Sequence, residues 1–233
     1  MNSFGHAWVA AWFSVRAPFL LGSILPDLAS ALRTSVPRAL EPELAAGIQL
    51  HHDTDRVFHT TGAFQSLEHH ARTRLADAGL SKGPRRALAH IGIEFLIDDE
   101  LGRDDDALSQ AATRPAAVAR YAAALRFGAS PSCRSLLHWS NAADADRFAL
   151  LCHRLGNIAV PANSARPADA DRRLSSRLIA CLSGRPRLEL QPHETLAIEP
   201  WLADCRPHVA AITPSLLAEL AQALEAPSLE AAE

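Results

Sequence analysis

Apolar residues recur at intervals of three and four along most of the chain, the spacing that places side chains on one face of an α-helix. This pattern occupies residues 40–58, 64–78, 85–101, 118–127, 132–138, 145–158, 170–182 and 214–224. Ala, Leu and Arg are abundant, whereas the β-branched and tyrosine residues that favour strands are sparse. The sequence therefore predicts an all-α fold.

The apolar segment near the N-terminus, residues 4–25, resembles a signal peptide or a membrane span at first sight. His6, Arg16 and Pro18 interrupt it before about 18 continuous apolar residues accumulate, and no basic region precedes it. We therefore expect a buried first helix over residues 3–13, a turn at Pro18 and a cytoplasmic protein. Residues 161–167 are expected to form a loop, and residues 226–233 a frayed tail.

Composition is that of a globular protein. With 233 residues, 48% of them hydrophobic, the chain is long enough for one compact helical domain over residues 1–225. A formal net charge of -3 provides no basic field for phosphates, so neither nucleic acid nor a membrane is expected as a partner. The four cysteines show no CxxC spacing and are predicted to be buried thiols.

Residue types that ligate metals gather in the first hundred residues. Two pairs have helical i,i+4 spacing, His51 with Asp55 and His90 with Glu94, so each pair can present a nitrogen and an oxygen in one direction. Both pairs are flanked by apolar residues, and such polar pairs are costly to bury without a metal or a partner. Two such pairs on facing helices would form a dinuclear site. The predicted ligands are His6, Asp27, His51, Asp55, His59, His90 and Glu94.

Two neighbouring metal ions would suit the hydrolysis of a phosphodiester, because they activate water and offset charge on the phosphoryl oxygens. A mixture of histidine and carboxylate ligands favours zinc, manganese or iron. We expect Asp27 to bridge the ions or bind one of them, and His59 to protonate the leaving alkoxide. The two i,i+4 pairs would supply the core ligands, and His6 and His59 would be outer ligands or supporting donors. Further candidate ligands are His52, Asp53 and Asp98.

Each candidate also has a simpler interpretation. His6 could be a core histidine, and Asp27 after Pro26 could be a helix-start residue. Asp53 and Asp55 beside Arg56 could lie on a solvated face. We expect such a face for His69 and His70 with their neighbours Glu68 and Arg72. The occurrence of two i,i+4 pairs together favours the metal site.

Four segments together resemble the acyl carrier protein phosphodiesterase family: MNSFGH at 1–6, GSILPD at 22–27, GIQLHHDTD at 47–55 and GRPRL at 184–188. They occur in that family's order, and the match extends over most of the chain. The resemblance implies an all-helical relative of the HD-domain hydrolases that uses a divalent metal, typically manganese. The implied reaction cuts the phosphodiester joining phosphopantetheine to a serine of acyl carrier protein.

By position, the family's polar residues correspond to His6, Asp27, His51 and Asp55. The chain departs from the family at His59, where an acidic residue is usual, and over residues 90–94, where an aspartate pair followed by histidine is usual. The order of ligands is also similar to that of zinc-dependent phospholipases C and single-strand-specific zinc nucleases, a similarity that covers only the ligands and the GSILPD segment.

An acidic carrier protein would require arginines near the mouth of the site. The candidates for substrate binding are Arg56, Arg185 and Arg187, with Arg33 and Arg38 as further ones. Other classes of function remain open, namely a phospholipase C-like or nucleotide phosphodiesterase, a helical di-iron or di-manganese oxidoreductase, and a non-catalytic helical module. The usual Glu-x-x-His spacing of the oxidoreductases is missing.

Overall fold

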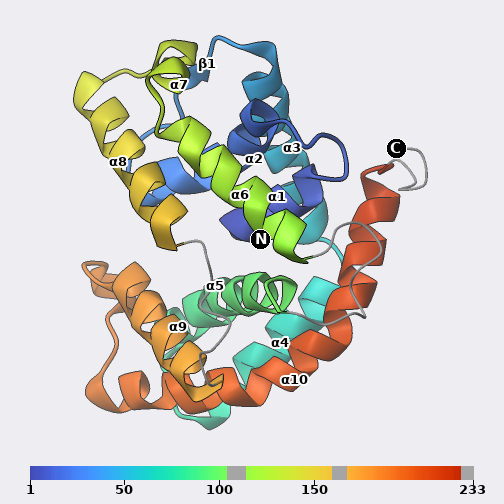
Figure 1. The fold of residues 1–233 in the computed structure, drawn as a ribbon. Coiled ribbons are helices and arrows are strands. Elements are labelled where there is room, and N and C mark those ends of the chain that lie inside the picture. The colour runs from blue at the N-terminus through green and yellow to red at the C-terminus, as the bar shows by residue number, and fades with distance from the viewer. Residues whose placement is uncertain (104–113, 159–166, 227–233) are drawn as a thin grey trace. The chain divides into compact units, whose positions relative to one another are not determined.

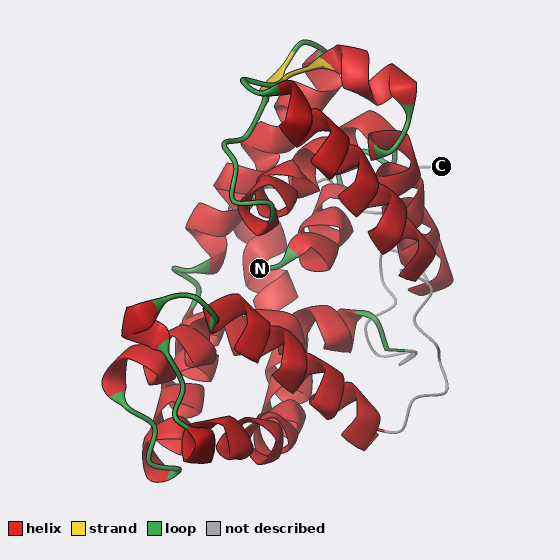
Figure 2. Ribbon diagram, turned by 90° about the vertical axis from the view of Figure 1, so that its left-hand side faces the viewer, coloured by secondary structure: helices red, strands yellow, loops and turns green. Residues whose placement is uncertain are grey.

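The computed structural model describes residues 1–103, 114–158 and 167–226. Helices make up most of this described part, which confirms the all-α prediction (Figures 1 and 2). The elements in chain order are α1 (Ser3–Ala10), α2 (Ala17–Ala31), β1 (Arg38–Ala39), α3 (Pro42–Phe58), α4 (Gly62–Asp77), α5 (Lys82–Leu101), α6 (Arg114–Gly128), α7 (Pro131–Leu136), β2 (Leu137–His138), α8 (Ala142–Ile158), α9 (Pro167–Leu182), the 3₁₀ helix η2 (Pro186–Leu188) and α10 (Pro192–Ala223). No helix among the described residues is both long enough and apolar enough to cross a bilayer.

The chain divides into two compact units, which we describe separately. Unit 1 comprises Met1–Val57, Leu101–Pro161 and Ala221–Glu233, and unit 2 comprises Phe58–Glu100 and Ala162–Leu220. The ligand candidates up to Asp55 therefore belong to unit 1, and those from His59 onward belong to unit 2.

Unit 1 is built around α2, whose apolar residues pack against α1, α6 and α8. The core contains Leu21, Ile24, Leu125, Phe148 and other buried residues from these helices. β1 and β2 form a two-stranded antiparallel sheet in which Arg38 pairs with His138 and Ala39 with Leu137. Residues 132–138, predicted as one helix, thus end in a strand.

Two glycines allow α2 and α3 to approach at backbone contact. A Cβ atom on Gly22 would lie 2.3 Å from the Leu44 carbonyl oxygen, and one on Gly47 would lie 2.2 Å from the Phe19 carbonyl oxygen. Real Cβ atoms do not approach other atoms so closely, so only glycine fits at either position. The crossing brings Ser23 of α2 next to the turn of α3 that carries His51.

Unit 2 packs α4, α5, α9 and α10 around buried residues such as Phe64, Leu88, Leu178 and Trp201. Helix starts in this unit are capped by side chains. The Thr61 hydroxyl accepts a hydrogen bond from the Phe64 amide at 3.2 Å. The buried Glu194 carboxylate accepts one from the Ser81 amide at 2.7 Å. Both acceptors satisfy amides that a helix leaves without an internal partner.

Proline positions account for the largest errors in the predicted elements. Pro18 lies in the first turn of α2, and Pro26 and Asp27 lie inside that helix, so the expected turn at Pro18 and the helix-start role of Asp27 are both wrong. α10 runs over 32 residues, whereas only residues 214–224 were predicted. It contains Pro200, Pro207 and Pro214, which are exposed and spaced by seven residues along one face. The predicted loop and tail fall outside the described residues, except that Pro167 begins α9 and Ala226 follows α10.

Candidate metal centre

Three helices of unit 1 each bring a polar side chain to one place. His6 comes from α1, Asp27 from α2 and His51 from α3, and each offers one ligand atom within 4.8 Å of the other two. The rings of His6 and His51 stack with centroids 4.0 Å apart. Both histidines are almost fully buried, with exposed fractions of 1% and 4%. The sequence could not show this convergence, because it depends on how the helices pack.

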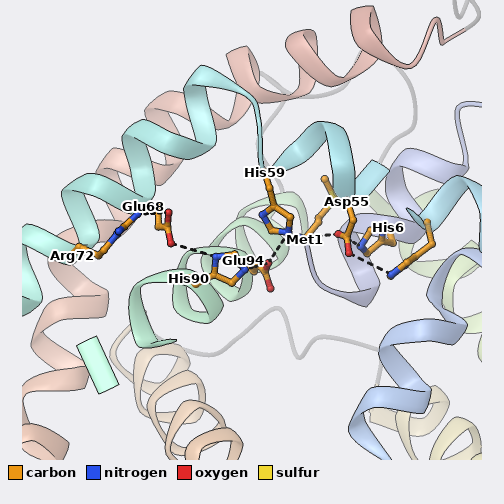
Figure 3. Close-up of polar contacts among 9 residues, drawn as sticks. Met1, His6, Asp55, His59, Glu68, Arg72, His90 and Glu94 are labelled. Atoms are coloured by element: carbon orange, nitrogen blue, oxygen red, sulfur yellow. Dashed lines mark hydrogen bonds and ion pairs between the residues drawn. The ribbon is translucent and has the colours of Figure 1, made fainter. Parts of the chain in front are cut away.

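Asp55 completes this group from the next turn of α3. His6 Nε2 lies 3.1 Å from Asp55 Oδ1, and His51 Nε2 lies 3.6 Å from Asp55 Oδ2. Figure 3 shows His6 and Asp55 pointing toward each other, with the Met1 amino group 3.7 Å from Asp55 Oδ1. His6, Asp27, His51 and Asp55 are called the unit 1 group below.

The tautomer of His51 follows from the contact that its Nδ1 atom makes. His51 Nδ1 lies 2.9 Å from the Ser23 carbonyl oxygen, which can only accept a hydrogen bond, so Nδ1 carries a proton. A neutral ring then has a lone pair on Nε2, and this lone pair faces the Asp55 carboxylate. Two acceptors oppose each other across this gap, an arrangement that a cation between them would relieve. A backbone carbonyl bound to the far nitrogen is also the usual support of a metal-ligating histidine.

Burial determines the charge states of the group. Desolvation lowers the pKa of His6 to about 3 and also lowers the pKa of His51, so both rings are neutral near pH 7. Burial opposes ionisation of Asp55, but the adjacent His6 outweighs it and lowers the pKa of that carboxyl. The result is two neutral imidazoles beside an ionised carboxylate, the protonation state that metal binding requires. His6 Nδ1 is buried and has no hydrogen-bond partner among the described residues.

We expect the metal-free protein to lose stability as the pH falls. The pKa of His6 is lower in the folded state than its ordinary value of 6.5, so the unfolded chain binds more protons between about pH 6.5 and pH 3. The free energy of unfolding should fall with pH in this window, by at most about 1.4 kcal/mol per pH unit from this residue. Urea titrations in a chelating buffer would measure it. His6→Gln should flatten the profile and His69→Gln, at an exposed position, should not; parallel profiles for all three proteins would contradict this assignment.

The second group lies in unit 2. His90 Nε2 lies 3.3 Å from Glu94 Oε1 on the same helix, and His59 Nε2 lies 3.9 Å from that oxygen. The rings of His59 and His90 stack at 4.8 Å, and Phe64 packs edge-on against both. One ligand atom from each of His59, His90 and Glu94 lies within 4.8 Å of the other two. We call these three residues the unit 2 group.

Glu68 of α4 lies beside the unit 2 group and was not among the ligands predicted from the sequence. Its Oε1 lies 3.4 Å from His90 Nδ1 (Figure 3), and its side chain is only 16% exposed, so its assignment to a solvated face was wrong. His90 therefore has a carboxylate oxygen near each nitrogen, while a neutral imidazole carries a single proton. A second proton or a metal would resolve that conflict. Spacing along the sequence could not predict this contact, because Glu68 and His90 lie on two different helices.

The remaining sequence candidates belong to neither group. His52 is exposed and packs its ring edge-on against that of His51, while Asp53 accepts hydrogen bonds from Gln49 and forms an ion pair with Arg56. Asp98 lies in α5, and none of these three belongs to a cluster of ligand atoms in the described residues. The arginine candidates are all exposed: Arg33, Arg38 and Arg56 in unit 1, and Arg185 and Arg187 in unit 2.

No protein-family model, curated protein or solved structure matches this chain. The resemblance to acyl carrier protein phosphodiesterases thus rests on the sequence segments alone. The predicted dinuclear site stays a prediction, since each unit is described by itself.

Proposed function

We propose that the protein is a metal-dependent phosphodiester hydrolase whose unit 1 group binds a divalent metal. The observation that carries this proposal is the opposition of His51 Nε2 and the Asp55 carboxylate, two acceptors held face to face in a buried setting. Asp27 and His6 add a carboxylate oxygen and a nitrogen at the same place. These two imidazoles and two carboxylates are ligands that suit zinc, manganese or iron.

The unit 2 group also combines imidazole and carboxylate donors, so it could bind a second divalent ion. Its donors are two imidazoles and Glu94, with Glu68 beside His90. A bound divalent metal supplies a Lewis acid that lowers the pKa of water and offsets charge on phosphoryl oxygens. The di-metal oxidoreductases are less well supported, because no Glu-x-x-His pair occurs in either group.

The chain's own residues prepare unit 1 for this chemistry. The Ser23 carbonyl fixes the orientation and tautomer of His51, and the stacked His6 ring limits its rotation. Burial keeps both rings neutral, so neither must lose a proton before it binds a cation. A preformed arrangement of this kind avoids reorganisation during the reaction. The expected role of His59 as a proton donor stays a prediction, and it is an alternative to His59 binding the second ion, because a ligated imidazole nitrogen has no proton to donate.

For the substrate, we propose holo acyl carrier protein, on the strength of the sequence resemblance. We expect protein loaded with manganese to release phosphopantetheine from it, measured as mass loss of the carrier. Arg56→Glu should raise KM severalfold at low salt and less at high salt, because rim charges act mainly on encounter. Arg172→Glu is the matched control, since Arg172 is 70% exposed and Arg56 is 71% exposed.

The test has three separable outcomes. Release of phosphopantetheine supports the full proposal. Cleavage of a small phosphodiester, with holo carrier protein untouched at low salt, removes the carrier protein and keeps the hydrolase. If protein loaded with zinc, manganese or iron cleaves no phosphodiester in a panel of lipid, nucleotide and carrier substrates, the hydrolase proposal is wrong.

A further inference from the structure

A third cluster of metal-ligating side chains lies in unit 2, where α4 packs against α10. His70 of α4 and the neighbours Asp204 and Cys205 of α10 each offer one atom within 4.8 Å of the other two. His208, one turn after Asp204, places its ring centroid 4.4 Å from that of His70. None of the four residues belongs to the unit 1 or unit 2 group. His70, predicted to lie on a solvated face, is half-buried in this contact.

The donor set indicates which metal the cluster would accept. It combines imidazole nitrogen and carboxylate oxygen with the Cys205 sulfur, and a thiolate selects zinc over manganese, magnesium or calcium. Tetrahedral zinc, with ligands at about 2.0–2.3 Å, separates its ligand atoms by roughly 3.3–3.8 Å. The ligand atoms of His70, Asp204 and Cys205 lie within 4.8 Å of one another, so small side-chain rotations would be enough to reach such separations.

The neighbouring groups are compatible with such an ion. Arg74 donates to both oxygens of Asp204, from Nε at 2.6 Å and from a terminal nitrogen at 3.2 Å, and thereby orients the carboxylate. Each oxygen keeps a second lone pair for a metal. Burial raises the pKa of Cys205 to about 12, so the thiol is protonated when no metal is bound. Binding would replace the S–H bond by a sulfur–zinc bond and release one proton to solvent.

We propose that His70, Asp204, Cys205 and His208 form a zinc site that fastens α4 to α10. The site is separate from the proposed hydrolytic centre and does not depend on it. An ion there joins residues that are about 130 positions apart in sequence, and it would stabilise the folded state by binding only that state. Asp204 and the half-buried His70 leave it accessible from solvent.

Cobalt is the probe that distinguishes this site from the other two. When Co²⁺ replaces zinc beside a thiolate, a sulfur-to-cobalt charge-transfer band appears in the near ultraviolet. The unit 1 and unit 2 groups contain no sulfur, so their cobalt complexes lack it. We expect the 233-residue protein titrated with Co²⁺ to show the band, and excess Zn²⁺ to remove it by displacement.

Variants assign the band to the cluster. Cys205→Ser should abolish it, while Cys181→Ser, at a half-buried cysteine of α9, should retain it. His70→Gln should weaken cobalt binding about 10-fold or more, whereas His69→Gln at the exposed neighbour should not. Because Cys205 is buried, circular dichroism is recorded for each variant, and His70→Gln gives a second test should Cys205→Ser unfold.

Variants of the unit 1 and unit 2 groups test whether the cobalt band is independent of them. His51→Ala and His90→Ala should keep the band, even if they abolish hydrolysis, so the two proposals can fail independently. Absence of the band in the parent protein, or its persistence in folded Cys205→Ser, would overturn the zinc site.

Discussion

Asp55→Asn is expected to lower metal affinity by about 10- to 100-fold while changing the stability of the metal-free protein much less. In the metal-free protein the Asp55 carboxylate faces the His51 Nε2 lone pair at 3.6 Å. An asparagine amide can donate a hydrogen bond to that lone pair, which removes the conflict between acceptors. The same substitution removes the negative charge that a cation needs. The metal-free fold gains that hydrogen bond but loses the contacts of the carboxylate with His6 and the Met1 amino group, so its stability should change little or fall, whereas metal affinity should fall sharply.

Metal titration and urea unfolding in a chelating buffer measure the two quantities. Asp53→Asn is the control on the same helix, because Asp53 pairs with Arg56 at the surface and should affect neither. A purely structural role for Asp55 predicts a different result for metal affinity. In that case Asp55→Asn would weaken the metal-free fold and leave metal affinity unchanged.

Gly47→Ala should destabilise the protein by about 1–3 kcal/mol or more and weaken metal binding in the protein that still folds. Its Cβ would lie 2.2 Å from the Phe19 carbonyl oxygen and 2.9 Å from the Gly22 Cα. Both are backbone atoms, so α2 and α3 have to separate. Separation moves the Ser23 carbonyl away from His51 Nδ1, and the ring loses the contact that sets its tautomer.

A glycine in another helix provides the control. At Gly156 of α8 an added Cβ would meet its nearest atom at 3.6 Å, an ordinary contact, so Gly156→Ala should be neutral or stabilise by up to about 1 kcal/mol. Urea midpoints and metal titrations of the two variants are compared with the parent. A Gly47→Ala protein that matches the parent in both would show that the α2–α3 crossing tolerates a methyl group.

Contacts within one helix could be predicted from the sequence, whereas contacts between helices could not. The spacing of four residues placed His51 beside Asp55 and His90 beside Glu94, as observed. The contact of His6 with Asp55 depends on the packing of α1 against α3. Gly22 and Gly47 set the distance between α2 and α3, and nothing in a single sequence pairs these two glycines.

Proline was the main source of error in the elements. Rules for single sequences count the hydrogen bond that a proline removes, but not the tertiary burial that can outweigh it. Trp201, Cys205 and Val209 of α10 are buried between its prolines, and they hold the helix together where its local sequence would end it. For the same reason Asp27, which follows Pro26 in the interior of α2, was given a helix start as its simpler interpretation.

The prolines of α10 also bear on the order in which unit 2 folds. Each interior proline disfavours an isolated helix by about 3 kcal/mol, so the segment with Pro200, Pro207 and Pro214 cannot serve as a nucleus by itself. It can become helical only as its apolar face reaches α4 and α5. We therefore expect the longest helix of the described chain to form late in the folding of unit 2, so that the residues it carries come together only after the rest of that unit has begun to assemble.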